Sequence, residues 1–342
     1  MGIDRTAVQR ILVIKLRAVG DVLLSTIVTK NLRLAFPDAQ LDFLTEVPSC
    51  DVLRGNPYIN ETLVYDRSTM NGALLLRRVR KGNYDLVIDL FGNPRTALLT
   101  FVSGARYRVG YDFRWRTHAY NIVVKPRGAL VHNTQFNLDA LDAIGVDIQD
   151  RNIYFHIGSD DAAYVDEFLG RAHLHGAFLV GVSTGGGWYT KRWGLENYAE
   201  LSDRLVEAYG AAIVLTWGPG QLAEVEEIAA GMKHNAFIPP DTTLRQLGAL
   251  LKRCSIVVSN DCGPMHIAAA VGTPVLGIYG PTNPVLQGPF GSQHVTVSKA
   301  GLACLGCNFM KCPIGHPCML DLSVDEVMTA VRQLLTKNHL TP

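Results

Sequence analysis

The sequence is 342 residues long, with 48% apolar residues, 18% charged residues and a formal net charge of +1. This length suffices for about two domains, and the apolar content excludes a mainly disordered chain. A net charge near zero disfavours nucleic acid as a partner, so electrostatic attraction must come from local patches. The early apolar run ILVIKL is too short for a secretion signal, and no run approaches the ~18 residues of a membrane-spanning helix. Seven cysteines without a visible export signal favour reduced thiols and a cytoplasmic location.

Short apolar runs that predict strands recur along the chain, and helix-like stretches separate them. The runs are Ile11–Leu16, Leu41–Thr45, Leu86–Leu90, Phe178–Ser183, Ala212–Trp217, Ile256–Ser259 and Val275–Tyr279. Such runs are typical of strands buried on both faces of a parallel sheet. Residues 197–209 carry a helical apolar stripe, and the pairs Thr243/Gln246 and Ser323/Glu326 predict capping boxes. The alternation predicts an α/β fold.

The pattern starts twice, at ILVIKLRAVGDVLLST and at FLVGVSTGGGWYTKRW, each time as a strand that leads into a loop of small residues. Residues 121–172 have weaker strand signals, and we expect a linker near 155–175. The sequence therefore predicts two Rossmann-like domains, 1–160 and 161–342, with a cleft between them. The second would end in a cysteine-rich tail and a final helix. Open α/β sheets bind ligands at the carboxyl ends of their strands.

The stretch SNDCGPMHIAAAVGTPVLGIYGPTNP, residues 259–284, places polar side chains where a strand ends and a helix begins. Pro264 suits the first turn of a helix, and Gly263 lets a ligand approach the backbone closely. Free N–H groups and the positive dipole end of this helix would bind an anion such as a diphosphate, beside Asp261 and His266. The alternative is that Asp261 only caps the helix and His266 is an ordinary buried histidine.

A second loop, VSTGGGWYTKRW at residues 182–193, has three glycines and then two cations after a strand. The glycines leave space for a ligand, and Lys191 or Arg192 could neutralise a departing phosphate. Taken alone, both cations also fit a solvated turn. The loop is not a Walker A loop, and the first strand leads into no G-x-G-x-x-G fingerprint, which disfavours an oxidoreductase of the Rossmann type.

A third segment, KLRAVGDVLLS, places Asp21 where the first strand would turn into its helix. A carboxylate at this position could act as a general base on a hydroxyl group. The alternative is that Asp21 caps the helix.

Together and in this order, these segments resemble glycosyltransferase family 9, the ADP-heptose:lipopolysaccharide heptosyltransferases. The resemblance covers most of the chain and includes ILVIKLRAVGDVLLST, YDLVIDLFGNPRTALLTFVSGARYRVGYD, VHNTQFNLDALDAIGV, TKRW and SNDCGPMHIAAAVGTPVLGIYGPTNP. It implies a GT-B fold whose C-terminal domain binds the nucleotide-sugar donor and whose N-terminal domain binds the acceptor. It also implies an inverting transfer of heptose from ADP-heptose to the inner core of lipopolysaccharide. The alternatives are another nucleotide sugar as donor, or a non-catalytic nucleotide-sugar-binding protein of the same fold.

The resemblance also implies roles for single residues. Asp21 falls on the catalytic aspartate of the family and Lys191 on its phosphate-binding lysine, so we expect a general base and a group that stabilises the leaving diphosphate. No D-x-D triplet is present, and we expect neither a metal nor another cofactor. Cys262 replaces the threonine of many members, and the loop before Lys191 is unusually glycine-rich, which leaves the donor sugar open. The expected donor-binding residues are Thr184, Gly186, Gly187, Thr242, Asp261, Cys262, Gly263, Pro264, Met265 and His266.

Two basic segments in the first half could attract a phosphorylated acceptor. Residues 77–81 read RRVRK, and residues 106–127 carry six cations against the single acid Asp112. Such a face would suit the lipopolysaccharide core, or the anionic lipids of the inner membrane at its cytoplasmic side. A solvated surface is the alternative, and it fits RRVRK better than the longer segment. The expected acceptor-binding residues are Arg106, Arg108, Arg114, Arg116 and His132.

The tail segment CLGCNFMKCPIGHPC contains Cys304, Cys307, Cys312 and Cys318. Four thiols within fifteen residues could bind zinc, but their spacing matches no standard zinc finger or ferredoxin motif. The alternative is a set of small packed thiols without a metal.

Overall fold

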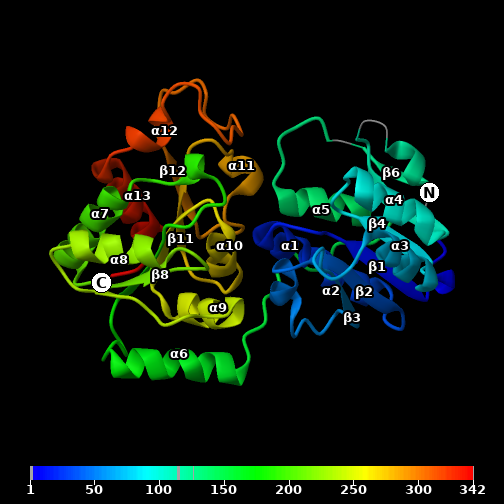
Figure 1. The fold of residues 1–342 in the computed structure, drawn as a ribbon, viewed down its shortest axis with the longest axis horizontal. Helices are drawn as coiled ribbons and strands as arrows, with labels where there is room; N and C mark the ends of the chain where they lie inside the picture. The colour runs from blue at the N-terminus through cyan, green and yellow to red at the C-terminus, as the bar shows by residue number, and fades with distance from the viewer. Residues whose placement is uncertain (1–2, 114–115, 126, 342) are drawn as a thin grey trace. The chain divides into compact units, whose positions relative to one another are not determined.

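The computed structural model describes residues 3–113, 116–125 and 127–341 (Figure 1). The chain divides into two compact units, Met1–His156 and Ile157–Pro342. The boundary between the units lies within the stretch 155–175 where we expected a linker, and helix α6 occupies Ser159–Arg171 of that stretch. The Asp161 carboxylate accepts a hydrogen bond of 2.9 Å from the Gly158 N–H at the start of α6. Val165 and Leu169, one helical turn apart, bury the inner face of the helix.

The first unit is built on a parallel six-stranded sheet with the order β3-β2-β1-β4-β5-β6. Its strands are β1 (Arg10–Ile14), β2 (Gln40–Glu46), β3 (Glu61–Tyr65), β4 (Leu86–Asp89), β5 (Tyr107–Tyr111) and β6 (Ile122–Val124). Its helices are α1 (Val19–Ser25), α2 (Ile27–Ala35), α3 (Gly72–Lys81), α4 (Pro94–Ser103) and α5 (Asn133–Asp142), with short 3₁₀ turns η1 (Arg5–Ala7), η2 (Ser49–Leu53) and η3 (Thr117–Ala119).

The second unit repeats this architecture with the order β12-β11-β10-β7-β8-β9, again with parallel neighbours. Its strands are β7 (Leu179–Ser183), β8 (Ala212–Thr216), β9 (Ala236–Phe237), β10 (Ile256–Asn260), β11 (Val275–Tyr279) and β12 (Val295–Ser298). After α6 come η4 (Tyr189–Lys191) and the helices α7 (Leu195–Tyr209), α8 (Leu222–Gly231), α9 (Leu244–Arg253), α10 (Gly263–Ala270), α11 (Pro284–Gln287), α12 (Pro317–Leu320) and α13 (Val324–Lys337).

Each unit has its own hydrophobic core between sheet and helices. In the first unit, Leu12 and Ile14 of β1 pack with Leu75 and Val79 of α3 and with Leu99 of α4. In the second, alternate residues of β7 and β8 pack against apolar stripes of α7 and α13. The central strands are buried on both faces, which explains their continuous apolar runs.

Both predicted capping boxes are confirmed. The Thr243 hydroxyl accepts from the Gln246 N–H, and the Gln246 side chain accepts from the Thr243 N–H, at the start of α9. Ser323 and Glu326 make the same reciprocal pair at the start of α13. Each box satisfies backbone donors that the first turn of a helix leaves without intrahelical partners.

The strand order places a topological switch point in the middle of each sheet. Renumbered within its unit, each sheet has the Rossmann order 3-2-1-4-5-6. The chain leaves the sheet in opposite directions after the two central strands, which are β1 and β4 in the first unit and β7 and β10 in the second. Ligands of open α/β sheets bind at the carboxyl ends of these strands.

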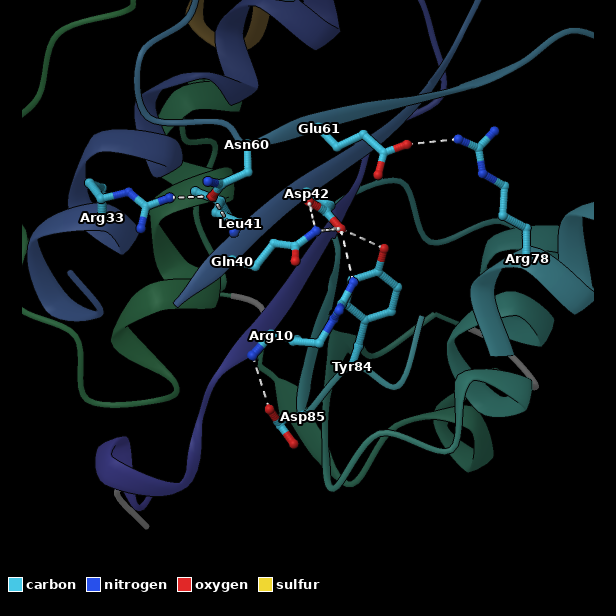
Figure 2. A network of polar contacts seen from close by, with 10 residues as sticks. All are labelled: Arg10, Arg33, Gln40, Leu41, Asp42, Asn60, Glu61, Arg78, Tyr84 and Asp85. Atoms are coloured by element: carbon cyan, nitrogen blue, oxygen red, sulfur yellow. Dashed lines mark hydrogen bonds and ion pairs between the residues drawn. The ribbon is translucent and has the colours of Figure 1, made fainter. Parts of the chain in front are cut away.

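The opposite, amino edge of the first sheet holds a polar network (Figure 2). Asp42 of β2, fully buried, accepts hydrogen bonds from the Tyr84 hydroxyl at 2.8 Å and from the Gln40 amide at 3.1 Å. The Arg10 guanidinium lies 3.9 Å from the same carboxylate, and the Asp85 carboxylate accepts from the Arg10 N–H at 2.9 Å. This network joins β1, β2 and the loop before β4, away from the ligand-binding edge, and so has a structural role.

Within the described ranges, no helix combines the length and the apolar character that crossing a bilayer requires.

Candidate functional site

A largely buried ion pair lies at the switch point of the second sheet. Lys191 of η4 and Asp261, which directly follows β10, join through an Nζ–Oδ2 contact of 2.7 Å, with side chains only 14% and 6% exposed. The Lys191 ammonium also lies 4.6 Å from the centre of the Trp188 ring. An ammonium group held at the carboxyl end of a central strand is suited to bind an anionic ligand.

Helix α10 begins at this pair. Cys262 is its N-cap, with Gly263 and Pro264 in the first turn, so Asp261 does not cap the helix. Instead, the Asp261 carboxylate accepts the hydrogen bond from Lys191. The Cys262 Sγ lies 3.2 Å from the Ser259 Oγ, and burial raises the pKa of this thiol. The alternative of a simple aspartate cap is therefore wrong.

Two further residues of the first turn of α10 are buried. Met265 is fully buried and accepts a hydrogen bond at its sulfur from the Tyr279 hydroxyl at 3.2 Å, which ties the helix to β11. His266 is 6% exposed. Met265 thus contributes to the core, while His266 lies buried in the first turn of α10.

The glycine-rich loop separates β7 from Lys191. A Cβ atom on Gly186 would lie 3.4 Å from the Lys191 Cβ, whereas a Cβ on Gly187 would meet no atom of the described residues within 4 Å. The Arg192 Nε donates to the Gly186 carbonyl at 3.3 Å, and Arg192 is also ion-paired with Glu224. Arg192 therefore stabilises the loop, and Gly187 borders open space.

Two buried hydroxyls at this edge of the sheet have no hydrogen-bond partner among the described residues. They are the Oγ1 atoms of Thr184, directly after β7, and of Thr282, just beyond β11; each residue is 2% exposed. Buried polar groups are normally satisfied, so such hydroxyls indicate a ligand or water. Thr184 was expected in the site, whereas Thr282 was missed. Its only signal in the sequence was a threonine after the apolar run VLGIYG.

Thr242 lies apart from these groups. It follows β9 and directly precedes Thr243, the N-cap of α9. In the sheet order, β9 stands two strands from β7. A ligand would therefore have to extend across β8 to reach Thr242 from the Lys191 pair.

In the first unit, Asp21 lies in the first turn of α1 and is half-buried. Its carboxylate accepts a hydrogen bond from the Ala18 N–H at 3.3 Å, so it does occupy a capping position. The distance is long for this kind of bond, and one carboxylate can accept several donors. Capping the helix therefore does not prevent Asp21 from accepting a proton.

Two buried ionisable groups that the sequence analysis missed, Lys15 and Asp89, lie at the switch point of the first sheet. The Lys15 Nζ, just beyond β1, donates to the Leu90 carbonyl at 2.9 Å. Burial lowers the pKa of Lys15, whereas the negative charges of Asp21 and Asp89 act to raise it. Asp89 ends β4 and accepts from the N–H groups of Phe91 and Gly92 and from the Tyr120 hydroxyl. Burial raises the pKa of Asp89. The sequence did offer a signal for both residues, because each is a charged residue within an apolar run that predicts a strand.

The expected acceptor-binding residues are scattered over β5, η3 and α5. Arg108 of β5 donates to the carbonyls of Ala105 and Ala119 and so joins the strand to the segments around it. Arg116 donates to the Gly92 carbonyl. His132 is the N-cap of α5 and accepts from the Thr134 N–H. Arg106 is exposed beside the Tyr107 ring. Arg114 lies outside the described residues.

The basic segment 106–127 is less charged than its sequence suggests. Arg127 forms ion pairs with Asp139, at 2.6 Å, and with Asp142, at 3.4 Å. Asp112 is the single acid within the segment, but α5 supplies two more acids from outside it.

All seven cysteines are free thiols. Cys304, Cys307, Cys312 and Cys318 line a small apolar cavity of about 170 Å³, together with Thr190 and His316. Burial raises the pKa of Cys318 to about 11. No group of three or more histidine, cysteine or acidic side chains in the described part of the chain is arranged to hold a metal ion. The Thr190 hydroxyl donates to the Phe309 carbonyl at 2.9 Å, so this loop supports the residue next to Lys191.

Comparison with known proteins agrees with this geometry. Residues 73–317 match the model of glycosyltransferase family 9 (heptosyltransferase). The lipopolysaccharide heptosyltransferase 3 of Escherichia coli K12 is 29% identical over 93% of this chain and 96% of its own length. The lipopolysaccharide core heptosyltransferase OpsX of Haemophilus influenzae is 26% identical over 87% of this chain and 86% of its own.

Solved structures show the same fold. The family 9 glycosyltransferase of Veillonella parvula superposes with a TM-score of 0.83 and 25% identity, over 96% of this chain and 97% of that one. The ADP-heptose lipopolysaccharide heptosyltransferase II of Escherichia coli gives a TM-score of 0.77 and 22% identity, over 97% and 100%. The predicted α/β class, with two Rossmann-like domains of the GT-B type, is confirmed. The chain belongs to glycosyltransferase family 9 and is a glycosyltransferase enzyme.

Proposed function

We propose that this protein transfers heptose from ADP-heptose to the inner core of lipopolysaccharide. The acceptor is supported by the relatives, which act on lipopolysaccharide according to their names and match most of this chain. The donor is supported by the motifs around Lys191 and Asp261 that resemble the ADP-heptose enzymes. The acceptor would place the enzyme at the cytoplasmic face of the inner membrane.

The observation that carries this proposal is the largely buried Lys191–Asp261 pair at the β7/β10 switch point. A diphosphate entering here would replace the Asp261 carboxylate as the partner of Lys191, or would share the ammonium with it. The start of α10 adds its dipole and N–H groups, while Thr184 and Thr282 offer hydroxyl donors. These groups can stabilise negative charge as it develops on the leaving diphosphate.

Asp21 would act as the general base. It takes the proton of the acceptor hydroxyl while the hydroxyl oxygen forms a bond to the anomeric carbon. The bond from that carbon to the diphosphate breaks, its electron pair leaves with the diphosphate, and the configuration inverts. This mechanism requires Asp21 and Lys191 to act on the same pair of substrates.

The test is an Asp21→Asn substitution, with Asp38→Asn as a matched control at an exposed aspartate of the same unit. We expect Asp21→Asn to lower turnover by ~10²-fold or more because the base is lost, while ADP binding is unchanged. Mass spectrometry of products from several nucleotide sugars and a deacylated lipopolysaccharide acceptor measures the transfer and identifies the donor. A folded Asp21→Asn variant with near-normal turnover would contradict the role of Asp21.

A further inference from the structure

Helices α3 and α4 lie side by side on one face of the first sheet (Figure 1). Their sequences, GALLLRRVRK and PRTALLTFVS, contain five cations and no acidic residue. Both helices bury one stripe against the sheet, through Leu75 and Val79 of α3 and Leu99 of α4. Their outer faces carry exposed apolar and basic side chains that have no role in the proposed catalytic mechanism.

The outer face of α4 is apolar beyond its first turn, where the exposed Arg95 is ion-paired with Glu46. Leu98 is 49% exposed and Phe101 is 59% exposed, and Leu74 of the neighbouring α3 is 52% exposed. Beside them runs an open groove of about 510 Å³, lined by Pro94, Ala97, Leu98 and Phe101 of α4 and by Arg116 and His118 on its other side. Large apolar side chains gathered at a groove are typical of an interaction surface.

The outer face of α3 is basic. Arg77, Arg78, Arg80 and Lys81 are all exposed. Arg78 is ion-paired with Glu61 at 2.8 Å, whereas no acidic partner is found for Arg77 or Lys81 within the described ranges. The Arg80 guanidinium donates to the Ser103 carbonyl at 3.0 Å, which fixes the basic end of α3 against the end of α4.

We propose that this α3–α4 face, defined by Leu74, Arg77, Lys81, Leu98 and Phe101, docks on an anionic phospholipid bilayer. Arginine and lysine would contact lipid phosphates while Leu98 and Phe101 enter the boundary of the acyl chains. A basic face beside exposed leucine and phenylalanine is the combination that binds helices to the surface of anionic membranes. The inference rests on the proposed function, because a lipid-anchored acceptor requires the enzyme to work at a membrane surface.

The test is co-sedimentation of the full chain with vesicles of phosphatidylcholine, with or without about a quarter phosphatidylglycerol. We expect binding only to the anionic vesicles, with a loss when salt rises from about 0.05 M to about 0.5 M. The double variant Leu98→Ser/Phe101→Ser and the double variant Arg77→Gln/Lys81→Gln should each weaken binding roughly tenfold. The control is Leu34→Ser, which changes a leucine that is 47% exposed on α2, a helix that packs against α5.

Three results would overturn the inference. They are absence of binding to either vesicle, binding that the α4 double variant leaves unchanged, and a dimer in sedimentation analysis that this variant dissociates. Thermal melts of each variant check that it folds. Transfer to a soluble deacylated acceptor should be unchanged in all variants. If the wild type itself fails in this transfer, the proposed function is contradicted, while the vesicle-binding result still stands.

Discussion

At the scale of single residues, the proposed donor site contains polar groups whose hydrogen-bonding capacity is only partly used within the described residues. Lys191 has one carboxylate as its partner, whereas an ammonium group has three donors. Thr184 and Thr282 have buried hydroxyls without partners among the described residues. Leaving a buried hydroxyl unpaired costs about 1–3 kcal/mol, so a bound phosphate that pairs it gains this amount back.

This cost predicts opposite effects of a threonine-to-valine change on stability and on binding. Thr184→Val and Thr282→Val should leave the free energy of unfolding unchanged or raise it, because each removes an unpaired hydroxyl. Each should weaken ADP binding by roughly tenfold, measured by calorimetry. Thr273→Val is the matched control, because its buried hydroxyl donates to the Leu251 carbonyl at 2.7 Å. It should lower stability and leave ADP affinity unchanged. Unaltered ADP affinity in both site variants would exclude these hydroxyls from the site.

At the scale of elements, strand prediction found the central strands of each sheet but missed all four edge strands and also β5, which lies between β4 and β6. All seven predicted strands exist, because central strands are buried on both faces and their apolar runs are continuous. β3 and β12 are edge strands with partly exposed residues, and β9 is two residues long. Their sequences alternate or are too short, so no continuous run predicts them.

The edge of the second sheet should respond to pH through His294. The Val275 N–H, at the start of β11, donates to the His294 Nδ1 at 3.1 Å, and the Lys337 Nζ of α13 donates to the His294 carbonyl. Burial lowers the pKa of His294 to about 4, and the nearby positive charges of Lys337 and His266 add to this effect. The folded protein thus holds His294 neutral, whereas the unfolded chain protonates it near pH ~6.5.

The free energy of unfolding should therefore be highest above about pH 6.5 and fall as the pH drops towards 4. Between about pH 7.5 and about pH 5, His294 should account for a loss of about 2 kcal/mol, measured by urea unfolding. In His294→Gln this part of the pH dependence should vanish, while His175→Gln, at an exposed histidine, should retain it. An identical pH dependence in wild type and His294→Gln would refute the assignment.

At the scale of the whole molecule, the same Rossmann strand order is built twice, each time around a separate core. ADP that binds at the β7/β10 switch point should therefore stabilise the unit Ile157–Pro342. The free energy of unfolding of this unit should rise by about 2.7 kcal/mol when ADP is about 100-fold above its dissociation constant. In calorimetry, the unfolding transition of this unit should therefore move to a higher temperature. Core variants assign each transition to a unit. Leu205→Ala should lower the transition of the second unit, and Leu12→Ala should lower that of the first. A shift confined to the transition that Leu12→Ala lowers would show that ADP binds the first unit.

The sequence by itself determined the fold class, the central strands, the capping boxes and the family, because each of these depends on residues that are close together in the chain. Only the tertiary structure decided which side chains meet. Lys191 and Asp261 are 70 residues apart and come within 2.7 Å, since β7 and β10 are neighbours in the sheet. Lys15 and Asp89 come close for the same reason, through β1 and β4. Local periodicity shows that a strand exists but not which strand pairs with it, so the composition of the site is a property of the assembled sheet.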